Sequence, residues 1–143
     1  MHQLVVFSLG AEEYGLPITA VQEIIRYTKP RTIPSAPPSV RGVINLRGKI
    51  IPVVDLKARL QLEGGDAEES KIVIIEAGAV TAGLIVDDVE EVLTVDESSL
   101  EQAPTGEVRC ISAVAKVGDR LLVLLDAEAM FGGEDPDGEL LAA

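Results

Sequence analysis

Few side chains in this 143-residue chain are suited to catalysis or metal binding. Its one histidine, His2, lies beside the N-terminus, where chains are often poorly ordered. Its one cysteine, Cys110, follows Arg109, whose charge would favour a thiolate, but the surrounding strand pattern favours a buried, inert side chain. One histidine and one cysteine form neither a zinc site nor a Cys–His nucleophile pair, so we expect neither.

The densest group of carboxylates is Asp87, Asp88, Glu90 and Glu91. Carboxylate oxygens are ligands for divalent cations, so a metal-binding or enzymatic small domain using this cluster is one interpretation. The other is structural, because Asp87 and Glu90 have the spacing of a capping box. In that case Asp87 caps a short helical turn, and Glu90 and Glu91 lie on its solvent face.

A binding function is favoured by residues 45–48, which read Asn45-Leu46-Arg47-Gly48. Arg47 and Gly48 lie at a predicted turn between two apolar strands, which would present the guanidinium at the surface. Arginine is the charged residue most enriched at protein interfaces. The alternative is that Arg47 is an ordinary surface residue with no role in binding.

The composition restricts the partners. The formal net charge is −12, which argues against a nucleic-acid or anionic-membrane partner, since both attract basic surfaces. Residues 26–59 nevertheless hold eight of the twelve Lys and Arg residues, so a basic partner-binding face and an ordinary solvated surface both remain open. A single cysteine, the lack of a signal peptide and the lack of a long apolar run predict a cytoplasmic protein.

The sequence contains an internal duplication. A shift of 68 positions places residues 4–25 on residues 72–93 without a gap, with seven of the 22 positions identical. About two identities are expected by chance. A shift of 71 positions places residues 43–60 on residues 114–131, so the two halves share one plan.

Each half begins and ends with a predicted hairpin. The turns of the first hairpins lie at Gly10 and Gly78, and those of the last hairpins at Gly48 and Gly118-Asp119. The last strand of each half is strongly apolar and ends on an aspartate suited to cap a short helix. These capping residues are Asp55 and Asp126.

Between its two hairpins, each half is predicted to form a short helical turn. In the first half, Thr19 and Gln22 have the capping-box spacing, and Val21, Ile24 and Ile25 then fall on one helical face.

Hydrophobic residues make up 47% of the chain but aromatic residues only 3%, so the core must be built from aliphatic side chains, which favours strands. Short strands at this density predict an all-β fold, either a small barrel or a sandwich. Two repeats of about 60 residues favour two small barrels, each marginal in core size alone and therefore packed on a shared hydrophobic seam. We expect one domain over residues 1–131, built from halves at about residues 4–60 and 72–131. Residues 132–143 are expected to form a flexible acidic tail.

Several motifs occur in a specific order between about residue 3 and residue 131. They are Val21-Gln22-Glu23-Ile24, Arg41-Gly42-Val43, Asn45-Leu46-Arg47-Gly48, Pro52-Val53-Val54-Asp55-Leu56, Gly83-Leu84-Ile85-Val86-Asp87 with Val89 and Glu91-Val92, and Gly118-Asp119-Arg120. In these motifs the chain resembles the CheW family, the chemotaxis coupling proteins of bacteria and archaea.

The resemblance implies two five-stranded SH3-like barrels and a signalling adaptor that is not an enzyme and needs no cofactor. Such an adaptor joins the regulatory domain of a chemotaxis histidine kinase to the cytoplasmic tip of chemoreceptors, without inserting into the membrane. Coupling within a non-chemotactic array, such as one controlling pili or a diguanylate cyclase, is an alternative.

The resemblance also implies roles for particular residues. Those expected to contact receptor or kinase are Val21, Glu23 and Arg47. Those expected to shape the binding surface are Gly42, Asn45, Leu46, Arg47 and Gly48. Those expected to line an apolar groove are Val89 and Val92. Ala113 stands where the family usually has glycine and would be strained if that position required a positive φ.

Overall fold

The computed structural model describes residues 2–34, 40–60, 70–102 and 111–127, most of which lie in strands. The strands of the first half are β1 (His2–Leu9), β2 (Glu12–Pro17), β3 (Val21–Arg26), β4 (Val40–Leu46) and β5 (Lys49–Asp55). Those of the second half are β6 (Lys71–Ala77), β7 (Val80–Val86), β8 (Asp88–Val95), β9 (Leu100–Gln102), β10 (Ile111–Val117) and β11 (Arg120–Leu125). The helical elements are η1 (Ile18–Ala20), α1 (Leu56–Arg59) and η2 (Glu97–Ser99). Cys110 and the expected tail, 132–143, lie outside the described residues.

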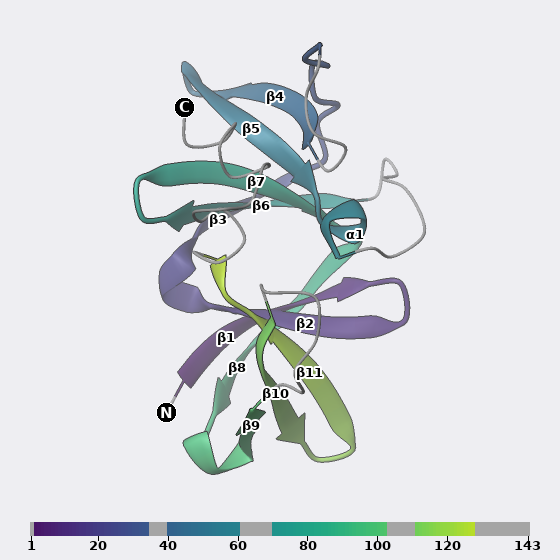
Figure 1. Ribbon diagram of the computed structural model, residues 1–143, viewed down its shortest axis with the longest axis vertical. Coiled ribbons are helices and arrows are strands. Elements are labelled where there is room, and N and C mark those ends of the chain that lie inside the picture. Colours follow the sequence, from purple (N-terminus) through teal and green to yellow (C-terminus); the bar gives the residue numbers. More distant parts are fainter. Residues whose placement is uncertain (1, 35–39, 61–69, 103–110, 128–143) are drawn as a thin grey trace.

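The strands form two sheets, which appear as the lower and upper bodies of Figure 1. The lower sheet has the order β8-β1-β2-β11-β10-β9, and the upper sheet has the order β3-β6-β7-β5-β4. The predicted all-β fold is confirmed, and the lower sheet gains a sixth strand, the three-residue β9.

Each sheet takes strands from both halves of the sequence. The β1–β2 hairpin lies in the lower sheet, whereas β3, β4 and β5 of the same half lie in the upper sheet. The second half divides in the same way. Replacing each strand by its repeat partner converts the order β3-β6-β7-β5-β4 into β8-β1-β2-β11-β10. The two sheets therefore have one topology, and neither sheet coincides with one half of the sequence.

The repeat extends to the strand register. The parallel pairing aligns Val53 with Gly83 in the upper sheet and Leu124 with Gly15 in the lower sheet. Gln22 is a bulge residue in the pairing of β3 with β6, and Glu90 is the equivalent bulge residue in the pairing of β8 with β1. Where equivalent positions of the two sheets make different contacts, the difference therefore comes from the side chains and not from the backbone.

A short helical turn does follow the first hairpin of the first half, at η1. The helical turns predicted over residues 21–25 and 87–91 are nevertheless wrong, because residues 21–25 belong to β3 and residues 88–91 belong to β8. Val21 packs on the seam, Ile24 is exposed and Ile25 packs inside the upper barrel, so they share no face. The bulge residue interrupts the alternation of a strand and imitates helical spacing.

Three apolar clusters hold the molecule together. One fills the upper sheet's interior, around Ile44, Ile72 and Ile85. A second fills the lower sheet's interior, around Val6 and Leu122. The third and largest lies between the sheets and confirms the predicted seam. Its buried members include Phe7, Leu16, Val54, Leu56, Val73, Ile75, Leu84 and Leu125.

Candidate protein-binding site

The β4–β5 turn holds its arginine in an unusual backbone conformation. Arg47 has φ 51° and Gly48 has φ 85°, and Arg47 is the only non-glycine residue with positive φ in the described part of the chain. The other three hairpins place glycine, with φ 61°, at the equivalent first turn position: Gly10, Gly78 and Gly118. A left-handed conformation costs a side-chain-bearing residue roughly 1–2 kcal/mol. Retaining arginine at this cost points to a use for its side chain.

The guanidinium of Arg47 is fixed by Glu23 of β3, the strand at the opposite end of the upper sheet's strand order. Arg47 donates from Nη1 to Glu23 Oε2 at 2.6 Å and from Nη2 to Oε1 at 2.5 Å, a bidentate pair. The Arg47 side chain is 69% exposed and that of Glu23 is 29% exposed. The pair therefore displays an oriented guanidinium at the surface.

The pair affects protonation more than stability. Hydrogen bonding to Arg47 is the main cause that holds the pKa of Glu23 below its ordinary value of 4.5, and Glu23 in turn raises the pKa of Arg47. Exposed ion pairs contribute little to stability because water screens them and because two long side chains lose freedom. The main effect of the Glu23–Arg47 pair is therefore to orient the two side chains.

The remaining residues of the segment support the turn. Asn45 accepts a hydrogen bond from the Gly48 backbone N–H through Oδ1 at 2.8 Å, which closes the turn. Leu46 is partly buried against the upper barrel's interior cluster. Asn45 and Leu46 thus hold the turn in place, while Arg47 projects from it.

Gly42 has a structural role at the base of the same hairpin. Its φ is 148°, and a Cβ at this position would lie 1.9 Å from the carbonyl oxygen of Arg31. Arg31 forms an isolated bridge with Val43, with N···O distances of 2.8 and 2.9 Å. Glycine is required for this close approach. The equivalent residue, Ala113, has no positive φ, so the strain considered for it does not arise.

Two exposed isoleucines lie on the strands that carry the charged pair, a feature that the sequence patterns did not reveal. Ile24 follows Glu23 and is 41% exposed, and Ile50 lies on β5 opposite Asn45 and is 61% exposed. Their repeat equivalents, Val92 and Leu121, are 54% and 60% exposed. The duplication could have indicated these pairs, because aligned positions share a face.

The expected site residues do not form one patch. Val21 and Val89 occupy equivalent positions of the repeat, and both are partly buried against the seam. Val92 lies on β8 of the lower sheet, opposite Val5, whereas Glu23 and Arg47 belong to the upper sheet. The structure thus unites Glu23 and Arg47 and leaves Val89 and Val92 on the other sheet.

The carboxylates considered for a metal site have other partners. Asp87 accepts from the Gly10 N–H at 2.5 Å and lies 2.9 Å from Lys57 Nζ. Glu91 accepts from Arg120 at 2.9 Å. Within the described ranges, no three His, Cys, Asp or Glu side chains gather as a metal site would require. In the same ranges, no helix is long and apolar enough to cross a membrane.

Two barrels of one topology on a shared seam, with an oriented charged pair at one hairpin, define a double-barrel domain with a candidate protein-binding surface. The family model described as the CheW-like domain matches residues 3–135. The chain therefore belongs to the CheW family.

Named relatives agree with this assignment. The chain is 38% identical over 137 residues to chemotaxis protein CheW of Bacillus subtilis, covering 92% of this chain and 88% of that protein. It is 33% identical over 138 residues to CheW of Klebsiella aerogenes, covering 93% and 83%. Among solved structures, scaffolding protein TtCheW of Thermoanaerobacter tengcongensis matches with a TM-score of 0.86 and 38% identity, over 95% of this chain and 94% of that one. The SH3-like character of the two barrels is thus confirmed.

Proposed function

We propose that this protein couples chemoreceptors to a chemotaxis histidine kinase by binding both, and that Arg47 with Glu23 is a central contact. The observation that carries the proposal is the backbone of Arg47. Three equivalent turns use glycine, whereas this turn holds a strained arginine whose guanidinium is oriented and 69% exposed. Membership of the CheW family supplies the class of partners.

The exposed side chains suit recognition of another protein. Ile24 and Ile50 provide apolar area on the strands that carry the Glu23–Arg47 pair. A helical receptor tip would lay an apolar stripe against such a surface. The charged pair would then select the partner and fix its register more than it raises affinity.

Coupling of this kind requires no turnover by the adaptor. Receptor state would reach the kinase as a difference in affinity between the states of the assembly. On this proposal the protein works in the cytoplasm, recruited to membrane-bound receptor arrays, and uses neither cofactor nor metal. Val21, Val89 and Val92 are proposed as further contacts.

Co-elution tests the proposal. The intact chain should elute with a chemotaxis histidine kinase on size exclusion, and Arg47→Glu should abolish the complex by placing two carboxylates together at the turn. Asp119→Lys, a charge reversal at the equivalent turn of the lower barrel, is the matched control and should leave the complex intact. A complex unaffected by Arg47→Glu would contradict the site.

One relative supports a different pathway with the same biochemical role. Protein PilI of Pseudomonas aeruginosa is 31% identical over 84 residues, which cover 58% of this chain and 47% of that protein. Its name does not refer to chemotaxis. Binding only to a kinase of another receptor array, and not to a chemotaxis kinase, would support this second candidate.

A further inference from the structure

The chain crosses between the two sheets twice, and Asp87 forms the second crossing. The strands β1 and β2 lie in the lower sheet, β3 to β7 lie in the upper sheet, and β8 to β11 lie in the lower sheet. Asp87 is the single residue between β7 and β8. Its backbone N–H donates to the Ser8 carbonyl oxygen at 3.0 Å, and its Oδ2 accepts from the Gly10 N–H at 2.5 Å. Both partners belong to the β1–β2 hairpin, so these bonds join Asp87 to the lower sheet.

The other carboxylate oxygen of Asp87 binds a lysine that is held by the upper sheet. Asp87 Oδ1 lies 2.9 Å from Lys57 Nζ, and the Lys57 side chain is only 14% exposed. Lys57 belongs to α1, which directly follows β5. The helix is anchored at its start, because Asp55 caps it and Leu56 is fully buried in the seam. We call the contacts of Asp87 with Lys57 and Gly10 the Asp87 tie, because they join the two sheets.

A longer contact between the sheets lies beside the Asp87 tie. Lys71 Nζ of β6 is 3.9 Å from Asp88 Oδ1 of β8, and these side chains are 37% and 59% exposed. An ion pair of this length and exposure contributes little, because water screens it. The stronger polar connection at the second crossing is therefore the one that Asp87 makes.

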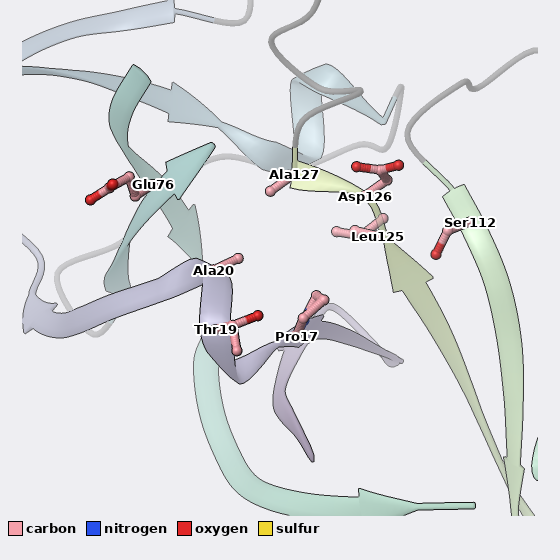
Figure 2. Close-up of a pocket in the computed structure, with 8 residues that line it drawn as sticks. All are labelled: Pro17, Thr19, Ala20, Glu76, Ser112, Leu125, Asp126 and Ala127. Carbon is pink, nitrogen blue, oxygen red and sulfur yellow. The ribbon is translucent and has the colours of Figure 1, made fainter. Parts of the chain in front are cut away.

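The first crossing, at η1, has no carboxylate at the equivalent position. The shift of 68 residues places Thr19 on Asp87, and the shift of 71 residues places Glu128, outside the described residues, on Lys57. Threonine carries no charge, so the sequence does not repeat the ion pair. Figure 2 shows Thr19 at this crossing, across a crevice from Leu125 at the end of β11. The two crossings therefore differ in their polar chemistry although the two sheets share one topology.

The Asp87 tie can fix an angle between the barrels, which apolar packing does less well. The seam is built mainly from aliphatic side chains, and the burial of apolar surface is non-directional. Hydrogen bonds, by contrast, weaken steeply when their angles change. A largely enclosed lysine also depends on its partner, because a buried charge without compensation is unfavourable. The seam therefore holds the barrels together, while the Asp87 tie favours one relative orientation.

We propose that Asp87 is a positioning residue, which sets, through Lys57 and Gly10, the angle between the barrels at which a partner protein contacts both. This inference rests on the proposed function, because the expected contacts lie on both barrels, with Arg47 on the upper sheet and Val92 on the lower sheet. Asp87 acts through the orientation of the barrels and needs no contact with the partner. The angle is measurable without a partner, so the two proposals can fail separately.

The test compares the natural chain with Lys57→Met by residual dipolar couplings of the intact ¹⁵N-labelled protein. Methionine keeps most of the lysine stem but removes its charge, and it leaves the Asp87–Gly10 bond in place. We expect the couplings of each sheet to fit the natural structure separately, while the angle between the sheets changes by roughly 10°, the scale of rigid-body rotations in switching proteins. An unchanged angle would overturn the proposal.

Two further variants control for the substitution. Lys116→Met breaks an ion pair of 3.0 Å with Glu101 that lies within the lower sheet, and it should leave the angle unchanged. Lys57→Arg keeps the cation and should keep the natural angle. A change in either control equal to that in Lys57→Met would overturn the role of the Lys57–Asp87 ion pair.

Affinity for the histidine kinase separates positioning from stability. Lys57→Met should weaken kinase binding about tenfold, within the range by which remote mutations alter coupling between sites, whereas Lys116→Met should not, even if both variants lower the Tm equally. A changed angle with natural affinity would overturn the positioning role. If the natural chain bound no kinase, the proposed function would fail, and the dipolar couplings would still decide whether the Asp87 tie orients the barrels.

Discussion

The last hairpins of the two barrels differ at their tips although their strands share one register. In the upper barrel, the turn carries Arg47, which pairs with Glu23 and is 69% exposed. In the lower barrel, the turn is Gly118-Asp119, and the following residue, Arg120, bridges Glu13 at 2.8 Å and Glu91 at 2.9 Å. Its side chain is 36% exposed.

The comparison separates two uses of an arginine. Glu91 is the repeat equivalent of Glu23, so each barrel ties this carboxylate to a guanidinium, but from different positions of the hairpin. Arg120 needs no unusual φ and joins strands β11, β2 and β8. Arg47 accepts a strained φ and leaves most of its surface open. We infer that Arg120 stabilises its barrel, whereas the exposed side chain of Arg47 serves to contact a partner protein.

The largest difference between the repeats is expected at Gly42. Gly42→Ala should lower the free energy of unfolding by about 3 kcal/mol, because a Cβ would lie 1.9 Å from the Arg31 carbonyl oxygen at φ 148°. Ala113→Gly, which makes the equivalent position glycine, should cost less than about 1 kcal/mol. Urea unfolding measures both. A loss below 1 kcal/mol for Gly42→Ala would contradict the close approach.

A smaller effect is expected at Asp55, the capping aspartate of α1. Asp55→Asn should cost about 2 kcal/mol, because it removes the carboxylate charge that accepts two hydrogen bonds from Arg41 at a nearly buried side chain. Asparagine remains a good helix cap, so the loss reports the charge and not the cap. Asp119→Asn, which removes the same charge from the exposed turn between β10 and β11, should cost less than about 0.5 kcal/mol. Equal losses in the two variants would contradict a stabilising ion pair at Asp55.

How far the sequence predicts this structure depends on the range of the interaction. The hairpins and the Asp55 cap depend on neighbouring residues, and Asp55 Oδ1 does accept from the Ala58 N–H at 3.3 Å. The strands β3 and β8 were missed because one bulge residue in each breaks the alternation.

Long-range features could not be predicted from local patterns. The exchange of strands between halves depends on pairings such as that of Val5 with Val92, far apart in the chain. Glu23 and Arg47 were expected as contacts through the family resemblance, but their direct pairing was not. The positive φ of Arg47 was equally hidden, since sequence favours glycine or asparagine at such a position.

The two arginines should also differ in their contribution to stability. Arg120→Ala should lower the free energy of unfolding, because it removes the guanidinium of β11 that bonds carboxylates on β2 and β8. Arg47→Gly should leave the free energy of unfolding unchanged or raise it slightly. Glycine relieves the strained φ, and the only interaction lost is the exposed ion pair with Glu23, which contributes little. A larger loss for Arg47→Gly than for Arg120→Ala would show that Arg47 is structural.

The smallest expected effects are in carboxylate titration. Hydrogen bonds from Arg120 and Arg47 hold the pKa values of Glu13 and Glu23 below the ordinary 4.5. Each pair therefore stabilises the fold above that pH, and the contribution disappears as the pH falls through the lowered pKa. In ¹³C NMR titrations, Arg120→Ala should return only Glu13 toward 4.5, and Arg47→Gly only Glu23. Movement of both carboxylates in either variant would show that the two sites are coupled.

The most direct test of the central claim exchanges the charges of the upper pair. The double variant Glu23→Arg/Arg47→Glu should rebuild the ion pair and unfold at the same urea concentration as the natural chain, but it presents a carboxylate at the turn. Affinity for the histidine kinase is then measured by calorimetry. We predict that the double variant binds as poorly as Arg47→Glu alone. Recovery of natural affinity would contradict the account, because the pair would then act only by holding the hairpin in place.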